Sequence, residues 1–171
     1  MEKPADFTFM HFGLLREAKP ENVQTVRIGA PARGPHNKLA TRAVWLNNNR
    51  LKSFKYLDIF INSILEEPIN LTWLDLSFNK LTDVDNSILR FPFLRILYLH
   101  GNKISDPKEI VKLKSMPELR ALTVHGNPVY SKKSYRQYMI SMLPQLVSLD
   151  FTRITAPERD YATAVRHDIE A

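Results

Sequence analysis

The segment Leu94-Arg95-Ile96-Leu97-Tyr98-Leu99-His100-Gly101-Asn102-Lys103-Ile104 decides the fold, because its pattern recurs along the 171-residue chain. Two leucines enclose one other residue, and an asparagine follows the second leucine by three positions. The same arrangement ends at Asn49, Asn79 and Asn127, with valine in place of some leucines. The four asparagines are separated by 30, 23 and 25 residues.

Intervals of this length are typical of leucine-rich repeats, whose units stack into a solenoid. A fifth segment, Leu146 to Phe151, keeps the strand half of the unit, but Ile154 stands where the asparagine is expected. Within each unit the paired leucines point inward and the residue between them points to solvent. We therefore expect an α/β leucine-rich-repeat solenoid of about five repeats. It should have a parallel sheet on the concave side, a helical or irregular convex side and a helical C-terminal cap.

The recurring asparagines should form a structural ladder through the stack. An inward-facing amide can both donate to and accept from backbone groups of neighbouring turns. Those groups would cost ~1–3 kcal/mol each if they were buried without a partner. We expect this role for Asn49, Asn79, Asn102 and Asn127.

The chain divides into a non-repeat N-terminal arm and linker (1–40), a leucine-rich-repeat domain with its cap (41–154) and a C-terminal amphipathic helix (155–171). The arm is rich in proline and glycine, yet Phe7, Phe9 and Phe12 make it too apolar for a merely solvated tail. Two interpretations stay open for it. The arm either covers the first repeat as a cap or folds onto a neighbouring protein.

The final helix is predicted by a capping box from Thr155 to Glu158 and by helical spacing of Tyr161, Val165 and Ile169. This helix either packs back on the cap or binds a partner. On the convex side, 53–66 has helical apolar spacing, and Asp106 to Glu109 places a cap, a first-turn proline and a reciprocal glutamate.

The concave face is the first candidate for partner binding. Strand alternation places one residue of each repeat in a central column and two more in flanking columns. Aromatic residues in such columns are notable because aromatics are enriched among binding hot spots. The competing interpretation is that they pack on one another or under the arm. The candidate partner-binding residues of the concave face are Trp45, Trp73, Asp75, Tyr98, His100, Thr123 and His125.

Nothing in the pattern predicts catalysis. His100 and His125 should stack at a strand spacing of roughly 4.8 Å, but no cysteine or third histidine adjoins them as a metal ligand. Asp75 and Asp150 are separated by two intervening strands, too far for a carboxylate pair unless the tail intervenes. The sequence has no glycine-rich phosphate loop and no nucleophile elbow. We expect no enzyme activity, no metal, no cofactor and no small-molecule substrate.

Positive charge concentrates in one segment. Residues 103–136 hold eight Lys/Arg against three Asp/Glu and so supply +5 of the net charge of +6. This basic rim could bind an acidic surface, although a run of charge is more commonly a solvated face. The candidate residues are Lys103, Lys108, Lys112, Lys114, Lys132 and Lys133.

Composition narrows the setting. The chain has no cysteine, which fits a reducing compartment, and it has no apolar run of signal-peptide or membrane-spanning length. It lacks the aromatic strand motifs and dense arginine runs of direct RNA binding. We therefore expect no membrane contact, no direct nucleic-acid binding and a place in the cytosol, nucleus or cilium.

From Trp45 to Ile154 the chain resembles the leucine-rich repeat-containing protein 51 family, in the strings Trp45-Leu46-Asn47-Asn48-Asn49, Leu74 to Thr82, Leu97 to Asn102, His125 to Pro128 and Tyr135 to Tyr138. The run from Asn127 to Ile154 also resembles the cap of small leucine-rich-repeat proteins of the phosphatase-regulator, axonemal dynein light chain and spliceosomal types. That resemblance implies a closing helix at about 132–143.

The family resemblance implies a ciliary setting and transfers no catalytic residues. We expect a non-catalytic protein-protein interaction module, a structural or adaptor component of the ciliary or flagellar axoneme. Its partners would be axonemal microtubule-associated proteins or tubulin, whose surfaces are acidic. The alternatives are a nuclear RNA-processing adaptor and a soluble phosphatase-regulatory scaffold.

Overall fold

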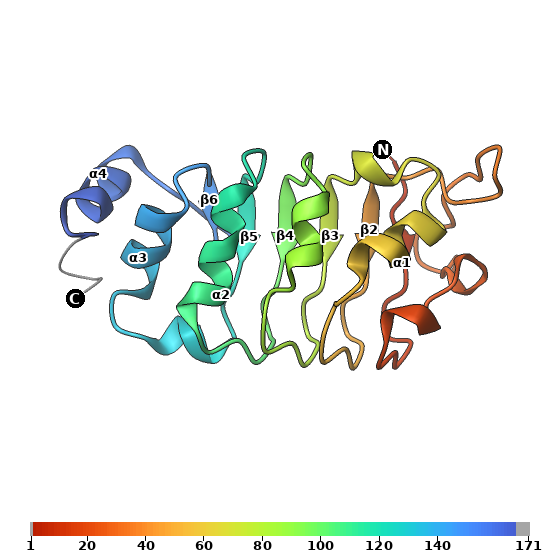
Figure 1. Cartoon of the computed structure of the whole chain (residues 1–171), viewed down its shortest axis with the longest axis horizontal. Helices are drawn as coiled ribbons and strands as arrows, with labels where there is room; N and C mark the ends of the chain where they lie inside the picture. The colour runs from red at the N-terminus through yellow and green to blue at the C-terminus, as the bar shows by residue number, and fades with distance from the viewer. Residues whose placement is uncertain (1, 167–171) are drawn as a thin grey trace.

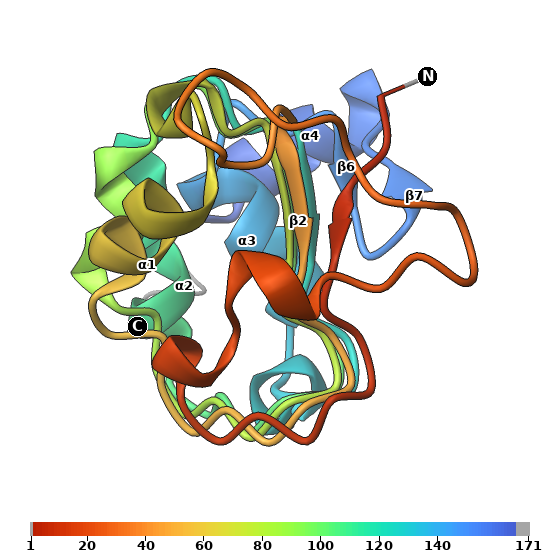
Figure 2. The ribbon, with the colours of Figure 1, turned by 90° about the vertical axis from the view of Figure 1, so that its right-hand side faces the viewer.

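The computed structural model describes residues 2–166 and has the shape of a curved stack, with the chain advancing from one end to the other (Figure 1). Within those residues one sheet contains seven strands in sequence order, the first six parallel and the last antiparallel. Figure 2 looks along the stack, with the strands superimposed on one side and α1 and α2 on the other. The strands are β1 (Ala5–Asp6), β2 (Ala43–Trp45), β3 (Trp73–Asp75), β4 (Ile96–Tyr98), β5 (Ala121–Thr123), β6 (Ser148–Leu149) and β7 (Thr152–Arg153).

The leucines of each repeat form the core between the sheet and the convex side. Leu74 pairs in register with Leu97, and Leu97 with Leu122, so that equivalent side chains lie in rows. These side chains are fully or almost fully buried. The burial of each leucine contributes about 1.5–3 kcal/mol, which is why the L-x-L pattern dictates the register.

The asparagine ladder is confirmed. The amide Nδ2 of Asn79 donates to the carbonyls of Leu46 and Leu76, in the preceding and its own repeat, both at 3.0 Å. Its Oδ1 accepts from the backbone N–H of Leu51 at 3.0 Å. Asn102 and Asn127 repeat this geometry. One residue type at one position thus satisfies three backbone groups in each turn.

The convex side is built from short helices, which end where proline or a backbone turn intervenes. The predicted helix of 53–66 forms as α1 only over Leu57–Ile64. At α2, Asp106 does cap the helix, but Glu109 accepts instead from Val84 N–H (3.0 Å) and Lys112 Nζ (2.6 Å). The α-helices are α1 (Leu57–Ile64), α2 (Pro107–Val111), α3 (Tyr135–Met142) and α4 (Ala156–Ala164). The 3-10 helices are η1 (Leu15–Glu17), η2 (Pro20–Asn22), η3 (Pro68–Asn70), η4 (Asn86–Arg90), η5 (Lys112–Ser115) and η6 (Pro128–Ser131).

The N-terminal arm covers the first repeat, and residues 5–12 adopt repeat geometry that the sequence did not reveal. Strand β1 pairs in parallel with β2. Asn49 donates to the carbonyl of Phe7 (2.8 Å) and accepts from the N–H groups of Met10 and Phe12 (3.0 and 3.1 Å), as the ladder asparagines do one repeat further on. Phe9 has φ 56°, matching Asn48, Phe78, Gly101 and Gly126 before the other ladder positions. The arm therefore begins as a degenerate repeat.

The C-terminal end stops the sheet by reversing the chain. Asp150 and Phe151 have φ values of 53° and 61°, and they join β6 to β7 as a two-residue hairpin turn. The carboxylate of Asp150 accepts from Val124 N–H (2.6 Å) and His125 N–H (2.9 Å). In the inner repeats the equivalent of Val124 N–H donates to a backbone carbonyl of the next strand, as Leu76 does to Tyr98. A side chain thus replaces the next strand's backbone.

Helix α4 packs back against α3, and its inward face is not the predicted one (Figure 1). Its capping box forms between Thr155 and Glu158. Tyr161 is exposed and Ala162 is buried, because Arg159 fixes the helix by donating to two carbonyls of the cap region. The predicted position Ile169 lies outside the described residues. Between residues 2 and 166, no helix combines the length and the apolar character needed to cross a membrane.

Candidate functional site

A continuous aromatic ridge runs along the concave face. We define it as Trp45, Trp73, Tyr98, His100, His125 and Phe151. The ring centroids are 5.3 Å apart for Trp45 and Trp73, 5.9 Å for Trp73 and Tyr98, and 5.2 Å for Tyr98 and Phe151. These three contacts are edge-to-face, a favoured geometry for aromatic pairs. The strand register places the columns as predicted from β2 to β5.

The concave aromatic residues show features of both interpretations, packing on one another and exposure to a partner. The rings pack on one another, and the Nε1 atoms of Trp45 and Trp73 are buried with no hydrogen-bond partner among the described residues. The two tryptophans, Tyr98 and the histidines nevertheless remain partly exposed. Packing fixes their rotamers, and so a partner would bind a surface that loses little side-chain entropy.

Phe151 is the ridge residue that sequence reasoning missed. Strand alternation alone would direct Phe151 inward and Thr152 toward the concave face, but the left-handed turn at Asp150 and Phe151 reverses the chain before Thr152 can reach that face. Phe151 is 61% exposed and contacts the rings of His100 and His125 at 5.5 and 5.6 Å. Its positive φ is that of the second residue of the hairpin turn between β6 and β7.

The two histidines stack as predicted. Their ring centroids are 4.7 Å apart with an interplanar angle of 7°. Burial, followed by the neighbouring His125, lowers the pKa of His100 to about 4, so its imidazole is neutral at physiological pH. Nδ1 of His100 lies 2.7 Å from the Thr123 hydroxyl. In the described part of the chain, no cluster of three or more His, Cys, Asp or Glu could hold a metal ion.

Two predicted concave residues are less available than expected. Thr123 is 1% exposed, because it lies under His100 and its hydroxyl also accepts from Leu99 N–H at 3.3 Å. The carboxylate of Asp75 accepts from the hydroxyl and the N–H of Ser77 at 2.6 and 2.9 Å. Burial raises the pKa of Asp75, and the Ser77 bonds only partly offset that effect. Asp75 therefore stabilises the strand end, while Tyr98 and Phe151 present the accessible surface.

The basic rim divides into free and engaged lysines. Lys103, Lys108, Lys114, Lys132 and Lys133 are exposed. Lys112 is engaged, because its ammonium is 2.6 Å from Glu109 and donates to the carbonyl of Val84. A cavity of about 430 Å³ brings together Lys108, Lys132, Lys133, Tyr135 and Tyr138.

The arm phenylalanines separate into three environments. Phe7 is fully buried, with ring contacts to Phe12 and Phe60 at 6.5 and 6.4 Å. Phe12 is partly buried against the core. Phe9 is 61% exposed. The first two close the end of the stack, and only Phe9 remains accessible.

Comparison with known proteins yields close relatives. A family model described as leucine-rich repeat matches residues 68–170. Leucine-rich repeat-containing protein 51 of Homo sapiens is 38% identical over 161 residues, which are 94% of this chain and 83% of that protein. U2 small nuclear ribonucleoprotein A' of Yarrowia lipolytica is 53% identical over 57 residues, 33% of this chain and 25% of that protein. A chain in the crystal structure of the Drosophila melanogaster SNF/U2A' complex superposes with a TM-score of 0.69 at 21% identity, covering 90% of this chain and 97% of its own.

Proposed function

This chain belongs to the leucine-rich repeat-containing protein 51 family, and on that premise we propose that it is a non-catalytic adaptor whose concave aromatic ridge binds a partner protein. The observation that carries the proposal is the ridge itself. It offers aromatic rings in fixed rotamers, partly exposed and in contact from Trp45 to Phe151. Such rings are the preferred anchors of protein interfaces.

The proposed setting is the ciliary or flagellar axoneme, with axonemal microtubule-associated proteins or tubulin as partners. The ground for this setting is what the family resemblance of the sequence implies. The exposed part of the basic rim also supports it, since Lys108, Lys132 and Lys133 gather beside two tyrosines and would complement an acidic protein surface.

The concave-face test uses the full chain on detergent-extracted axonemes. The double variant Tyr98→Ala with Phe151→Ala should lose at least about tenfold in retention, because hot-spot aromatics each contribute about 2 kcal/mol or more. The matched control is Phe93→Ala, which removes an exposed ring outside the ridge. Equal retention of the double variant and the control would reject the concave face as the binding surface.

The basic rim is tested separately by salt. Lys132→Gln with Lys133→Gln should lower retention and flatten its salt dependence, because a rim ion pair is screened over about 8–10 Å at physiological ionic strength. Lys52→Gln with Lys80→Gln removes the same charge from exposed positions elsewhere and is the control. Retention that is insensitive to salt would remove the electrostatic part of the proposal.

A second candidate function is that of a nuclear RNA-processing adaptor. The specific observation in its favour is the 57-residue segment that is 53% identical to U2 small nuclear ribonucleoprotein A'. Proximity labelling from the tagged chain in a ciliated cell separates the candidates. Labelled axonemal proteins support the first, labelled spliceosomal proteins the second, and a labelled soluble phosphatase the scaffold alternative.

A further inference from the structure

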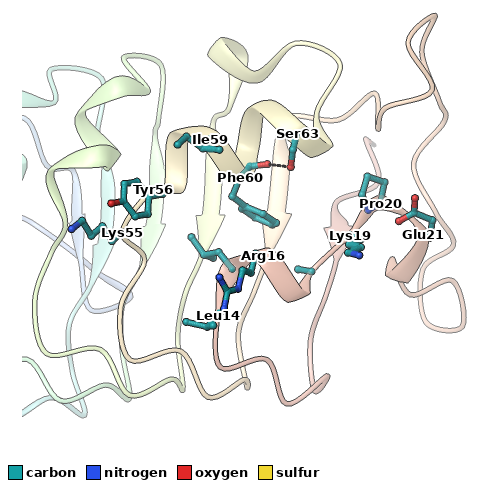
Figure 3. Close-up of a pocket in the computed structure, with 12 residues that line it drawn as sticks. Leu14, Arg16, Lys19, Pro20, Glu21, Lys55, Tyr56, Ile59, Phe60 and Ser63 are labelled. Atoms are coloured by element: carbon teal, nitrogen blue, oxygen red, sulfur yellow. Dashed lines mark hydrogen bonds between the residues drawn. The ribbon is translucent and has the colours of Figure 1, made fainter.

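An apolar groove lies on the convex side at the N-terminal end, away from the aromatic ridge. We call it the convex groove. It is formed where η1 and η2 of the arm face α1, and its volume is about 660 Å³ (Figure 3). Its apolar lining includes Leu14, Leu15, Pro20, Tyr56, Ile59 and Phe60.

The convex groove arises from the two departures of this chain from a regular repeat. The first repeat interval is 30 residues instead of 23 or 25, and its convex segment contains α1, a full helix of eight residues. The arm supplies the opposite wall through its two 3-10 helices. Regular repeats stacked on each other would not leave this space, since their convex segments pack side by side.

The groove exposes apolar surface that the fold does not need. Helix α1 points Leu57, Phe60, Ile61 and Ile64 toward the core, but Ile59 on its outer face is 62% exposed. Tyr56 and Leu14 beside it are also exposed. A contiguous exposed apolar patch with a polar border is typical of a binding surface.

The border of the groove is positively charged. Figure 3 shows Lys55 at one end, Lys19 at the other beside Glu21, and Arg16 between them. None of these three cations forms an ion pair within residues 2–166. The nearby acid Glu17 is engaged, because its carboxylate accepts from Gly13 N–H at 2.8 Å.

We propose that the convex groove binds an amphipathic helical segment of a partner protein, with large apolar side chains on one face and acidic residues flanking them. The apolar floor selects the first feature, and the three cations without a carboxylate partner select the second, although Lys55 also lies over the ring of Tyr56 at 5.1 Å. A second copy of this chain is disfavoured by like charge, since each copy has a net charge of +6. With the ridge on the opposite side, the chain would connect two partners at once.

The probe is a set of designed helical peptides of about 18 residues, five turns long. All share one leucine and isoleucine face and differ only in having Glu, Gln or Lys flanks. Fluorescence anisotropy with the full chain should give affinity for the Glu peptide about tenfold tighter than for the Gln peptide, with the Lys peptide weakest. Equal affinities, or the reverse order, would overturn the proposal.

Variants locate the binding. Ile59→Ser should weaken the Glu peptide about tenfold, whereas Ile69→Ser, which changes an equally exposed isoleucine (57%) outside the groove, should not. Lys19→Gln with Lys55→Gln should reduce the preference for Glu over Gln flanks. The double variant Tyr98→Ala with Phe151→Ala should bind all peptides normally, and so failure of the ridge proposal would leave this result unaffected.

Three outcomes would refute the proposal, and the last two of them would assign the groove to a different occupant. Unchanged peptide binding by Ile59→Ser would place the peptides elsewhere. A dimer in sedimentation velocity that Ile59→Ser dissociates would make a second copy the occupant. A dansylated fatty acid that binds more tightly than any peptide and is released by the same variant would make the groove a lipid site.

Discussion

The two ends of the solenoid terminate the stack of repeats in different ways. Each end must pair the hydrogen-bonding groups that a neighbouring repeat would otherwise satisfy. At the N-terminal end the arm imitates a repeat, so that Asn49 finds in Phe7, Met10 and Phe12 the backbone groups that a preceding repeat would offer. At the C-terminal end Asp150 substitutes a carboxylate for the missing strand. The first end continues the backbone pattern, and the second replaces it with side-chain chemistry.

The difference has a physical consequence for how each end can fail. An imitated repeat still has an outer strand edge, which the chain covers when Gln24 N–H donates to the carbonyl of Asp6 at 2.8 Å. Its stability comes from buried apolar surface such as Phe7. The substituted end depends on one carboxylate and on its charge. The N-terminal end should therefore respond to cavities in its apolar core, and the C-terminal end to loss of the Asp150 carboxylate.

The largest effect should come from Phe7→Ala. Removing a fully buried phenylalanine typically costs about 3–5 kcal/mol in the free energy of unfolding. Urea denaturation measures that cost, and hydrogen exchange should locate the lost protection in residues 2–30. Phe9→Ala is the control from the same arm, because Phe9 is 61% exposed. Uniform loss of protection along the solenoid would mean that the arm is not a separable cap.

Asp150→Ala should cost about 2–4 kcal/mol, because it leaves the N–H groups of Val124 and His125 and the Tyr135 hydroxyl without their acceptor. The Tyr135 hydroxyl is 2.9 Å from the carboxylate. Chemical denaturation measures the change, with Asp160→Ala as the exposed control. A cost as small as that of the control would show that water replaces the carboxylate.

Acidification should destabilise the fold through His100, which lies just beyond the end of β4. The pKa of His100 is lowered to about 4, so between pH 6.5 and 4 the unfolded chain binds a proton that the folded chain does not. Stability should therefore fall as the pH falls through this window, by ~1–2 kcal/mol after discounting for solvent screening. Thermal melts of the wild type and His100→Gln measure this slope. An unchanged slope in His100→Gln would assign it to other groups.

The smallest effects come from a matched pair of exposed phenylalanines. Phe9 and Phe151 are both 61% exposed and both have positive φ, at opposite ends of the stack. Phe151→Ala loses ring contacts with Tyr98, His100 and His125 and should cost ~0.5–1 kcal/mol, whereas Phe9→Ala should be nearly neutral. Melting temperatures measured side by side decide this. Equal shifts would mean that the ridge contacts add nothing to stability.

The sequence predicted the parts of the fold that depend on repetition. The ladder of asparagines, the strand columns and the stacked histidines all follow from one spacing and from strand alternation. The degenerate repeat in the arm was missed because Ala5 replaces a leucine and Met10 stands at the ladder position. Spacing carries no signal when both marker residues are absent.

Other features were missed because tertiary geometry overrides local pattern. The alternation of apolar and polar residues does not indicate the left-handed turn that places Phe151 on the ridge. The inward face of α4 is set by Arg159 reaching two distant carbonyls, which helical spacing cannot foresee. The convex groove could not be predicted from the sequence, because it forms only where the arm lies against α1. Its cations are unremarkable in sequence.

The ridge also determines which surface of this molecule intrinsic tryptophan fluorescence monitors. The chain contains two tryptophans, and both belong to the ridge, with ring centroids 5.3 Å apart. Intrinsic tryptophan emission therefore originates entirely from the concave face, and Tyr98 lies close enough to pass excitation to it. A partner on the ridge should change the emission, whereas one in the convex groove should leave it unaltered. The protein thus contains an internal reporter that distinguishes its two surfaces without any label.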